Sequence, residues 1–419
     1  MPLSAVIEDL TLKFKRPQVN GLKAILYIPH VIADTTTHEN GMMPPPADDG
    51  FGPGPSAAIL YNCHGQCEYL PINELSGTQS MKNADILTGI TTTGTPHLGN
   101  YVGAIRPAIE ASRDETKQAY YFLADYHSII KCQDPRRIEN SALKIAATWI
   151  AFGLDTDKSI FYRQTDIPEV MELTWILTCM TSKGLMNRAH AYKAAVAKNE
   201  ETEKKDPDKD ITMGLFCYPI LMAADILMFN AKKVPVGKDQ IQHLEMTRDI
   251  ASRFNNTYGE HFVLPQAVVD DNTSVLSGLD GRKMSKSYNN TIPIFEEEKR
   301  FRKLIMKIKT NSLGPEEPKD PETCTLFAIY RAFATSDDIK NMEKRYRQGI
   351  SWGTMKQELF DFLNETLKEP RKRYNELIKS PGDIDNILKN GALRAREYAV
   401  PFIDKIRKSI GIKPITNLM

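Results

Sequence analysis

Two short stretches of this 419-residue chain carry side chains of types that could bind a phosphate group. The first is TTTGTPHLGN at residues 91–100, which follows an apolar run and precedes apolar residues at helical spacing. Unpaired N–H groups at a helix N-terminus favour anions, and Gly94 and Gly99 let the backbone approach a ligand closely. His97 and Asn100 add donors that could follow charge growing on a phosphoryl oxygen. Taken alone, the stretch is better explained as a threonine-rich turn that caps a helix than as a phosphate site.

The second stretch is GLDGRKMSKSYNN at residues 278–290, where Lys283 and Lys286 stand three apart with no acidic residue between them. Two ammonium groups held close together repel unless an anion lies between or near them. The pyrophosphate of ATP is such an anion, and Gly278 and Gly281 would let the loop close over it and open again. Taken alone, a loop with two lysines is usually a solvated turn.

A regular alternation of strand and helix patterns surrounds these stretches from Ile86 onward. Such alternation predicts the α/β class, with a doubly wound Rossmann-type parallel sheet that binds ligands at the carboxyl ends of its strands. Pro107 falls inside the helical pattern of residues 101–109 and predicts a kink or an early stop there. The predicted strands are 86–91, 119–124, 159–163 and 234–236, and the predicted helices are 135–153, one opening at 168, 214–229 and 239–254.

Changes of pattern along the chain predict three domains. Residues 1–83 form a small appended N-terminal module of unknown role, with strand patterns at 11–14 and 22–28 and a Pro/Gly-rich loop at 42–55. Residues 84–293 form the Rossmann-type domain that carries both stretches, the candidate catalytic domain if they bind phosphate. The almost wholly charged segment within 196–210 is expected to be a solvated surface loop. Residues 294–419 form an all-helical C-terminal domain. Its basic clusters at 299–309 and 368–373 are candidate contacts to an RNA backbone, although most such runs are solvated helix faces.

The composition is that of an ordinary soluble globular protein, with 41% hydrophobic and 26% charged residues. The net charge of +1 requires any nucleic-acid surface to be local. No window approaches the roughly 20 apolar residues of a membrane helix, and the N-terminus lacks a signal-peptide pattern. The six cysteines favour reduced thiols in the cytoplasm over a disulfide framework. Cys63 and Cys67 could hold a metal, but without a second ligand pair free thiols are favoured.

Together, the two stretches resemble the paired HIGH and KMSKS motifs of class I aminoacyl-tRNA synthetases, since HLGN is followed about 180 residues later by an intact KMSKS. The segments between them resemble the bacterial-type tryptophanyl-tRNA synthetases. The resemblance runs from about residue 84 to near the C-terminus and rests on FLADYH at 122–127, Asn187-Arg188, YPILMAADIL at 218–227, VPVGKDQ at 234–240 and QHLE at 242–245. It implies a homodimer that activates L-tryptophan with ATP and Mg²⁺ and transfers it to tRNA(Trp), with the helical domain on the anticodon.

Asp225 is the single charged residue in the apolar run of residues 218–229. A buried carboxylate is costly unless paired, and a structural partner such as a backbone N–H or an arginine is the ordinary explanation. The resemblance instead makes Asp225 the acceptor for the indole N–H of tryptophan, a group that donates but does not accept. Such a site would reject phenylalanine because the acid would be left unpaired. Met222, one turn earlier, would lie against the indole, although plain core packing explains it nearly as well.

The resemblance assigns three sets of site residues. The catalytic set is His97, Asn100, Lys283 and Lys286. The tryptophan-binding set is Gly89, His127, Tyr218, Met222, Asp225 and Gln240. The ATP-binding set is Thr91, Thr92, Thr93, Gly99, Asn100, Gly237, Lys238, Asp239, Val275, Lys283, Met284, Ser285, Lys286 and Ser287. No metal ligand is predicted.

The sequence also departs from the family pattern. Thr91-Thr92-Thr93 stands where related enzymes often carry Gln-Pro-Ser, His97 replaces a common threonine, and Asn100 stands in for the last histidine of HIGH. The nearest rival function is a tyrosyl-tRNA synthetase, whose pocket must satisfy a phenol hydroxyl. A non-catalytic tRNA-binding paralogue has no need of both lysines of KMSKS, and a small nucleotidyltransferase has no need of so large a helical domain.

Overall fold

The computed structural model of the protein describes residues 57–61, 67–71, 83–202, 206–269 and 276–412. The chain divides into two compact units, Met1–Met81 and Lys82–Met419. In the first unit, strands β1 (Ala57–Tyr61) and β2 (Cys67–Pro71) pair antiparallel. The strands predicted at 11–14 and 22–28, like Cys63, lie outside the described residues.

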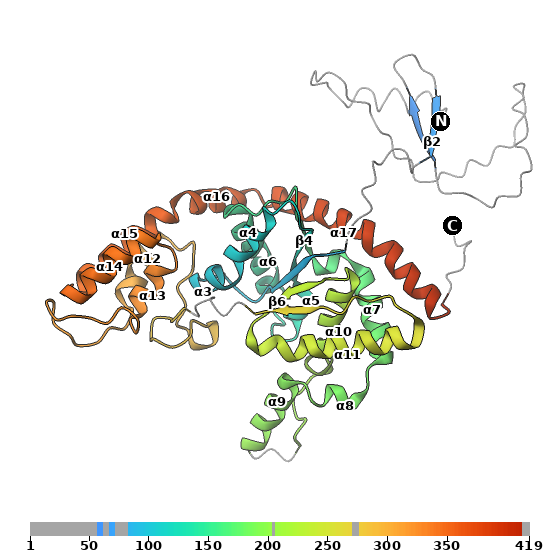
Figure 1. The fold of residues 1–419 in the computed structure, drawn as a ribbon, viewed down its shortest axis with the longest axis horizontal. Coiled ribbons are helices and arrows are strands. Elements are labelled where there is room, and N and C mark those ends of the chain that lie inside the picture. Colours follow the sequence, from blue (N-terminus) through green and yellow to red (C-terminus); the bar gives the residue numbers. More distant parts are fainter. Residues whose placement is uncertain (1–56, 62–66, 72–82, 203–205, 270–275, 413–419) are drawn as a thin grey trace, which may run out of the picture. The chain divides into compact units, whose positions relative to one another are not determined.

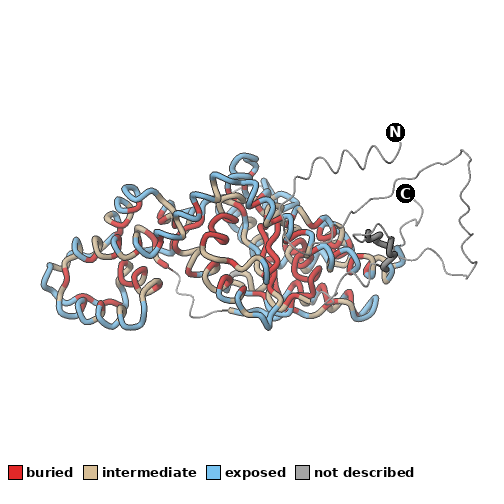
Figure 2. The backbone as a smooth tube through the Cα atoms, turned by 90° about the horizontal axis from the view of Figure 1, so that it is seen from above, coloured by how far each residue is buried: buried red, intermediate tan, exposed pale blue. Residues whose placement is uncertain are grey.

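A five-stranded parallel sheet forms the centre of the second unit, with strand order β5-β4-β3-β6-β7 (Figure 1). This confirms the predicted fold class, although β7 was not predicted. All six positions of β4 are buried, as expected for a central parallel strand covered on both faces. In Figure 2 the buried segments gather in the interior of the fold, and the exposed segments lie along its outside. The strand order reverses between β3 and β6, and the carboxyl ends of these two strands are therefore the expected ligand site. The strands are β3 (Ile86–Thr91), β4 (Ala119–Ala124), β5 (Ile160–Arg163), β6 (Lys233–Pro235) and β7 (Gln266–Val268).

Helices connect these strands, and their bounds follow the predicted ones closely. Up to β7, the helical segments are α3 (Leu98–Asn100), the π-helix η1 (Tyr101–Ile105), α4 (Arg106–Ser112), α5 (Asp125–Ile129), α6 (Pro135–Ala151), the 3-10 turn η2 (Gln164–Asp166), α7 (Pro168–Met180), α8 (Lys183–Met186), α9 (His190–Glu201), α10 (Met213–Met228), the 3-10 turn η3 (Lys238–Gln240) and α11 (Ile241–Tyr258). The irregularity expected at Pro107 is a π-helical turn just before it, with no early stop, because Pro107 then occupies the first turn of α4, where no N–H is needed.

The expectation of a solvated loop within residues 196–210 is wrong for its first part. Helix α9 continues to Glu201, and the side chain of Asn199 is buried. Its amide donates to the carbonyl oxygens of Pro207 and Lys209, each at 2.8 Å, and so ties the returning chain to the helix. The charges mark exposed positions, but one buried amide fixes the backbone.

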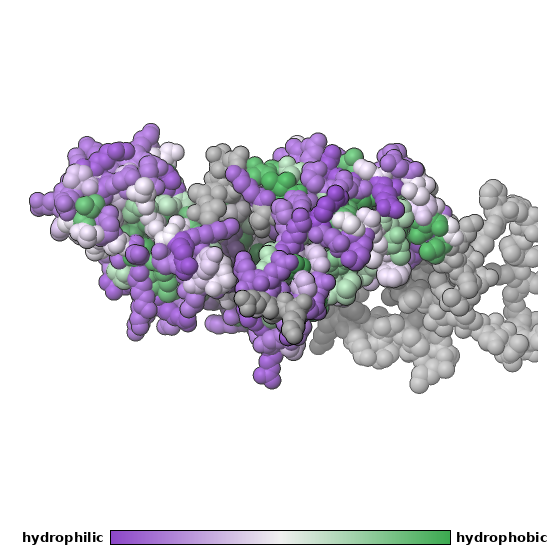
Figure 3. Space-filling view, turned by 90° about the horizontal axis from the view of Figure 1, so that it is seen from below, coloured by the Kyte–Doolittle hydropathy of each residue, from purple (hydrophilic) through white to green (hydrophobic). Residues whose placement is uncertain are grey.

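After β7 the described chain is helical apart from connecting turns. The segments are the 3-10 turn η4 (Lys286–Tyr288), α12 (Glu298–Met306), α13 (Thr325–Arg331), α14 (Ser336–Gln348), α15 (Trp352–Thr366), α16 (Lys368–Lys379) and α17 (Pro381–Ser409). On the face shown in Figure 3, hydrophilic side chains cover most of this helical part.

The last helix, α17, returns to the sheet and packs along β5 (Figure 1). The approach is close at Gly391, where an added Cβ would lie 1.8 Å from the carbonyl oxygen of Phe161. Arg394 donates to the carbonyl oxygens of Thr156 and Ser159, at 3.0 and 3.1 Å. The boundary proposed at residue 293 therefore separates strand-containing from helical sequence, while α17 packs with the strands.

Candidate active site

A cavity of about 500 Å³ opens where β3 and β6 end. All six residues of the predicted tryptophan-binding set line this cavity. They come from β3, α5, α10 and η3. The remaining lining is largely apolar, which suits a flat aromatic ligand. The complete set of lining residues is Leu87, Gly89, Ile90, Thr91, Thr93, Phe122, Ala124, His127, Ile130, Lys131, Ala191, Leu215, Tyr218, Met222, Asp225, Ile226, Val234, Pro235, Val236, Gly237 and Gln240.

Asp225 presents a buried carboxylate to this cavity, with 3% of the residue exposed. Burial raises the pKa of Asp225 above its ordinary value, and contacts to its charged form oppose that rise. The contacts come from His127, whose Nε2 lies 2.9 Å from Oδ2, and from Gln164, whose Nε2 donates to Oδ1 at 2.7 Å and to Oδ2 at 2.9 Å. The amide of Gln164 and the ring of His127 thus hold the carboxylate of Asp225 at an apolar wall of the cavity.

A glycine shapes one part of the cavity wall. A Cβ added to Gly89 would lie 2.4 Å from the ring of Phe122, because the two residues are paired across β3 and β4. Any side chain at Gly89 would displace this ring, which itself stacks on Tyr162 with centroids 5.7 Å apart. A side chain at position 89 would therefore change the shape of the cavity, which both Gly89 and Phe122 line.

A buried histidine links two of the lining residues. The hydroxyl of Tyr218 lies 2.9 Å from Nε2 of His243, and Nδ1 of the same ring lies 3.0 Å from Oε1 of Gln240. Because Gln240 Oε1 can only accept, Nδ1 of His243 carries a hydrogen. The polar groups at this end of the cavity are thus oriented by one imidazole.

A second cavity of about 630 Å³ lies beside the first and shares Ile90, Thr91, Thr93 and Gly237 with it. It brings together the two stretches that the sequence singled out. The lining residues are Ile90, Thr91, Thr93, Gly94, Pro96, His97, Gly99, Asn100, Gly103, Ala104, Ile145, Gly237, Leu276, Lys283, Met284, Ser285, Lys286, Ser287 and Tyr288. All four predicted catalytic residues are among them.

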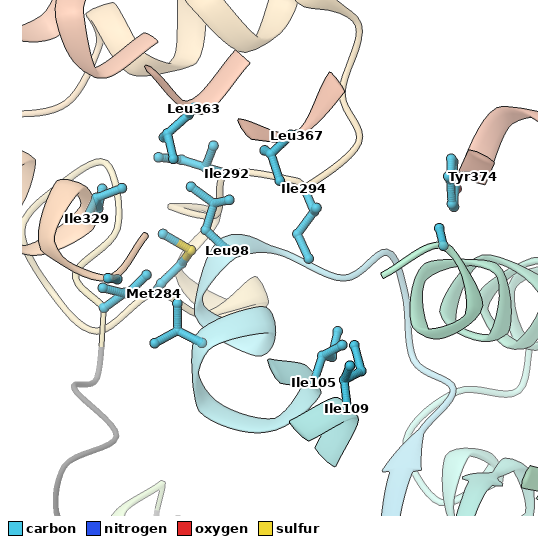
Figure 4. Packing of buried hydrophobic residues seen from close by; sticks show 14 of the residues in the cluster. Leu98, Ile105, Ile109, Met284, Ile292, Ile294, Ile329, Leu363, Leu367 and Tyr374 are labelled. Atoms are coloured by element: carbon cyan, nitrogen blue, oxygen red, sulfur yellow. The ribbon is translucent and has the colours of Figure 1, made fainter. Parts of the chain in front are cut away.

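Backbone pairing holds the two stretches side by side. Leu98 N–H donates to the carbonyl oxygen of Ile292 at 3.0 Å, and Ile294 N–H donates to that of Pro96 at 3.2 Å. The side chain of Met284 packs with Leu98 and Ile292, where helices α13 and α15 meet the site (Figure 4). The methionine of KMSKS is thus an anchor in the core, and the lysines on either side of it face the cavity.

His97 caps the short helix that follows it. Its Nδ1 accepts from Asn100 N–H at 3.3 Å, while its own N–H donates to Asn100 Oδ1 at 3.1 Å. Burial, and then the nearby ammonium of Lys286, lower the pKa of His97 to about 4. The ring is therefore neutral at pH 7, and since Nδ1 accepts, its hydrogen sits on Nε2. His97 can donate one hydrogen bond without adding charge.

The ammonium of Lys286 lies over Gly94. A Cβ at Gly94 would stand 3.3 Å from Nζ of Lys286, and the φ of +131° at this position also disfavours any side chain. Burial and, second, the charge of Arg137 lower the pKa of Lys286 to about 8, although part of the side chain remains exposed. An ammonium next to another cation in a polar cavity is what an anionic ligand stabilises.

Asn290 organises the loop that carries both lysines. Its Nδ2 donates to Asp280 Oδ1 at 2.7 Å and to the carbonyl oxygens of Arg282 and Lys283 at 3.3 and 3.1 Å, and its Oδ1 accepts from Ser285 N–H at 2.8 Å. The residue is buried. This one side chain therefore closes the loop on itself.

Four of the predicted ATP-binding residues are not among the described residues that line the second cavity. Thr92 is fully buried and turns to Ser128, with its N–H donating to Ser128 Oγ at 2.7 Å and the two hydroxyl oxygens 2.8 Å apart. Lys238 lines neither of the two cavities. Val275 lies outside the described residues, and so does the side chain of Asp239.

Sequence reasoning missed several side chains that organise the site: Gln164, Phe122, Ser128, His243 and Asn290. Two of them had a signal in the sequence. Asn290 directly follows the lysine loop, and His243 lies one helical turn after Gln240. For Gln164 there was none, because only the tertiary arrangement of η2 and α10 brings it to Asp225.

Among the described residues, no group of three His, Cys, Asp or Glu is arranged to hold a metal ion. In the same part of the chain, every helix is too short or too polar to cross a lipid bilayer.

Comparison with known proteins places this geometry in a family. The family model described as tRNA synthetases class I (W and Y) matches residues 79–368. The chain is 56% identical over 333 residues to the tryptophan–tRNA ligase of Pseudomonas aeruginosa, covering 79% of this chain and 74% of that one. It is 55% identical over 335 residues to that of Neisseria meningitidis, covering 80% and 100% of the two chains.

Solved structures give the same picture. The tryptophanyl-tRNA synthetase of Campylobacter jejuni, complexed with ADP and tryptophan, superimposes with a TM-score of 0.72 at 44% identity over 78% of this chain and 99% of that one. The enzyme of Mycoplasma pneumoniae superimposes with a TM-score of 0.66 at 27% identity, covering 80% and 99%.

Proposed function

The chain belongs to the class I tRNA synthetases for tryptophan and tyrosine, and within that family we infer that it is a tryptophan–tRNA ligase. It activates L-tryptophan with ATP to tryptophanyl-adenylate and pyrophosphate, and it transfers tryptophan to tRNA(Trp). The observation that carries the choice of tryptophan is Asp225, a buried carboxylate held by His127 and Gln164 at the wall of an apolar cavity. An indole N–H satisfies that acceptor, whereas the side chain of phenylalanine leaves it unpaired.

The shared border of the two cavities supports the place of the first reaction. Thr91, Thr93 and Gly237 line both cavities, so the carboxylate of tryptophan in the first would meet the α-phosphate of ATP in the second. In that step a carboxylate oxygen bonds to the α-phosphorus and the bond to the pyrophosphate oxygen breaks. The enzyme contributes position and charge, and no covalent bond to the protein is needed.

The cationic and neutral donors of the second cavity have different roles in this proposal. Lys283 and Lys286 offset the charge that builds up on the departing pyrophosphate. His97, neutral and carrying its hydrogen on Nε2, and Asn100 donate to phosphate oxygens without repelling the lysines. The hydroxyls of Ser285 and Ser287, which lie 2.8 Å apart, line the same cavity.

Mg²⁺ is expected with ATP in this reaction class. Among the residues that the structure describes, those lining the second cavity offer hydroxyl and amide oxygens but no carboxylate. Mg²⁺ binds through few protein ligands and keeps phosphate oxygens and water. We therefore assign the ion no protein ligand and propose that it arrives on the phosphates of ATP, where it would add to their charge neutralisation.

In the second step, a terminal ribose hydroxyl of the tRNA attacks the carbonyl carbon of the adenylate, and AMP leaves. The helical segment from α12 to α16 is proposed to bind the anticodon. In the two predicted basic clusters of this segment, the exposed residues are Lys299, Arg300, Arg302, Lys303, Lys307, Lys309, Lys368, Lys372 and Arg373. Arg371 is half-buried against Phe301 and supports the helix instead.

We also propose a homodimer in the cytoplasm. Large apolar side chains are exposed around a third cavity of about 420 Å³ formed by α5, α7 and α10, which shares Ile130 and Tyr218 with the tryptophan cavity. Ile129 is 51%, Met171 38%, Trp175 68% and Met213 70% exposed. An apolar face of this kind is a candidate interface, and a second copy of the chain would cover it.

Amino-acid-dependent exchange of labelled pyrophosphate into ATP tests the function, with tryptophan, tyrosine and phenylalanine supplied separately. Exchange with tryptophan alone is expected. Exchange with tyrosine alone would overturn the assignment of the cavity, and the lack of exchange with all three would overturn the catalytic assignment.

A further inference from the structure

Gln164 is the one residue in contact with both carboxylate oxygens of Asp225 among the described residues. Its Nε2 donates to Oδ1 at 2.7 Å and to Oδ2 at 2.9 Å, whereas His127 Nε2 reaches Oδ2 alone. A single amide hydrogen-bonded to both oxygens defines the plane of the carboxylate. The rotation of that group about its Cβ–Cγ bond is therefore fixed by Gln164.

Gln164 does this from outside the cavity. It is the first residue of η2, directly after β5, it is fully buried, and it does not line the tryptophan cavity. Asp225 comes from α10, on a different part of the chain. Gln164 can therefore affect a ligand only through Asp225.

The carbonyl oxygen of the Gln164 side chain indicates that a glutamine at residue 164 does not maximise the stability of the fold. Oε1 of Gln164 is buried and has no hydrogen-bond partner in the described part of the chain. Burying an acceptor without a partner costs stability, and an apolar side chain of similar length would avoid that cost. The feature that a glutamine adds at this position is its amide donor, directed at Asp225.

A neutral donor also suits the chemistry of the acceptor. A lysine or arginine at residue 164 would neutralise the carboxylate and weaken it as an acceptor, while an apolar residue would favour its protonated form, which donates. The amide of Gln164 is neutral, so it donates to the carboxylate of Asp225 without neutralising its charge. Of the two oxygens, Oδ1 is contacted by Gln164 alone among the described residues, and so it keeps the larger acceptor capacity.

We propose that Gln164 is a positioning residue that sets amino-acid specificity, because its amide fixes the carboxylate of Asp225 with Oδ1 ready to accept the N–H of an indole ring. This inference rests on the proposed function, since it assumes that tryptophan occupies the first cavity. Recognition of the ring nitrogen would then depend on Gln164 as well as on Asp225, although Gln164 does not contact the substrate.

The test compares tryptophan with β-(3-benzothienyl)alanine, which has the same shape but carries sulfur in place of the ring N–H. Gln164→Met keeps the side-chain length and removes the donor. Its dissociation constant for tryptophan should rise about 10- to 100-fold, the range expected for losing a hydrogen bond to a charged group, and that for the sulfur analogue should change less than twofold. Calorimetric titration of the full-length protein measures both values.

Gln118→Met is the matched control. Gln118 precedes β4 at the opposite end of the sheet, and its Nε2 is likewise buried without a hydrogen-bond partner among the described residues. This variant should bind both ligands like the unmodified protein. In an Asp225→Asn background, Gln164→Met should cause no further loss for tryptophan, because its effect passes through the carboxylate.

ATP binding serves as the measure of correct folding, and Gln164→Leu replaces Gln164→Met if the latter does not bind ATP. Equal weakening of tryptophan and of the sulfur analogue, or unchanged discrimination between them, would overturn the role of Gln164. Failure of the unmodified protein to bind tryptophan would overturn the proposed function instead, so the two failures are distinguishable.

Discussion

Asn290 offers the sharpest test of how the lysine loop works. Three of its hydrogen bonds go to backbone groups of the loop, at Arg282, Lys283 and Ser285. A net value of about 1 kcal/mol for each bond gives about 3 kcal/mol of preference for the observed loop conformation. Replacing Asn290 by alanine removes that preference and, at about 1.4 kcal/mol per factor of ten, shifts the loop equilibrium about 100-fold.

The loss of these hydrogen bonds should weaken the use of ATP and leave tryptophan binding unchanged. Pyrophosphate exchange at varied ATP concentration should give a kcat/KM for ATP about 100-fold lower in Asn290→Ala, because Lys283 and Lys286 are no longer held at the second cavity. The tryptophan dissociation constant, measured by calorimetry, should stay within twofold. Asn290→Asp should be impaired as well, since it puts a second carboxylate beside Asp280, whose pKa is held at about 2 chiefly by the amide of Asn290.

Asn140→Ala is the matched control for this prediction. Asn140 lies exposed on α6 and donates to the carbonyl oxygen of Arg136 at 2.8 Å, away from the loop. It should exchange pyrophosphate at the unmodified rate. A kcat/KM for ATP within twofold of the unmodified value in Asn290→Ala would refute this role of Asn290. So would a parallel loss of affinity for ATP and tryptophan.

Other predictions concern the charges and the exposed face. Asp225→Ala should weaken tryptophan binding by calorimetry and erase discrimination against phenylalanine, while ATP binding survives; equal loss of ATP binding would mean that the residue is misplaced. Lys283→Ala and Lys286→Ala should slow pyrophosphate exchange far more than they weaken tryptophan binding, and equal losses would indicate a folding role for the loop. Because the pKa of Lys286 is lowered from 10.5 to about 8, ATP affinity should fall as pH rises through 8, and Lys286→Arg should flatten that profile. The unfolded chain keeps this proton up to the higher pH, so Lys286 should make the free energy of unfolding rise between about pH 8 and 10.5. Trp175→Glu should yield a monomer by light scattering, and an unchanged mass would place the dimer contact elsewhere.

The sequence predicted the elements that depend on local pattern. The bounds of β3 and β4 were correct to the residue, and the helix opening at Pro135 was correct as well, because apolar runs and proline positions are read directly from the chain. Strand β7 was missed, since all three of its positions are exposed and it lacks the apolar run that marks a buried strand.

The sequence singled out the candidate site residues on the two stretches because their residue types suggest phosphate chemistry, and the structure brings them to one cavity. The residues that hold them were not. Gln164 and Asp225 are 61 positions apart, and only the arrangement of β5 and α10 brings them together. Thr92 illustrates the opposite error, since its hydroxyl suggested a ligand contact, yet the direction of the strand turns it into the protein toward Ser128.

The central claim is that this chain attaches tryptophan to its tRNA. The most direct measurement is ATP-dependent charging of tRNA(Trp) by the full-length protein, with labelled tryptophan and labelled tyrosine in parallel reactions. Charging with tryptophan and none with tyrosine is the predicted result. No charging with tryptophan in the presence of ATP, or charging with tyrosine instead, would contradict the account.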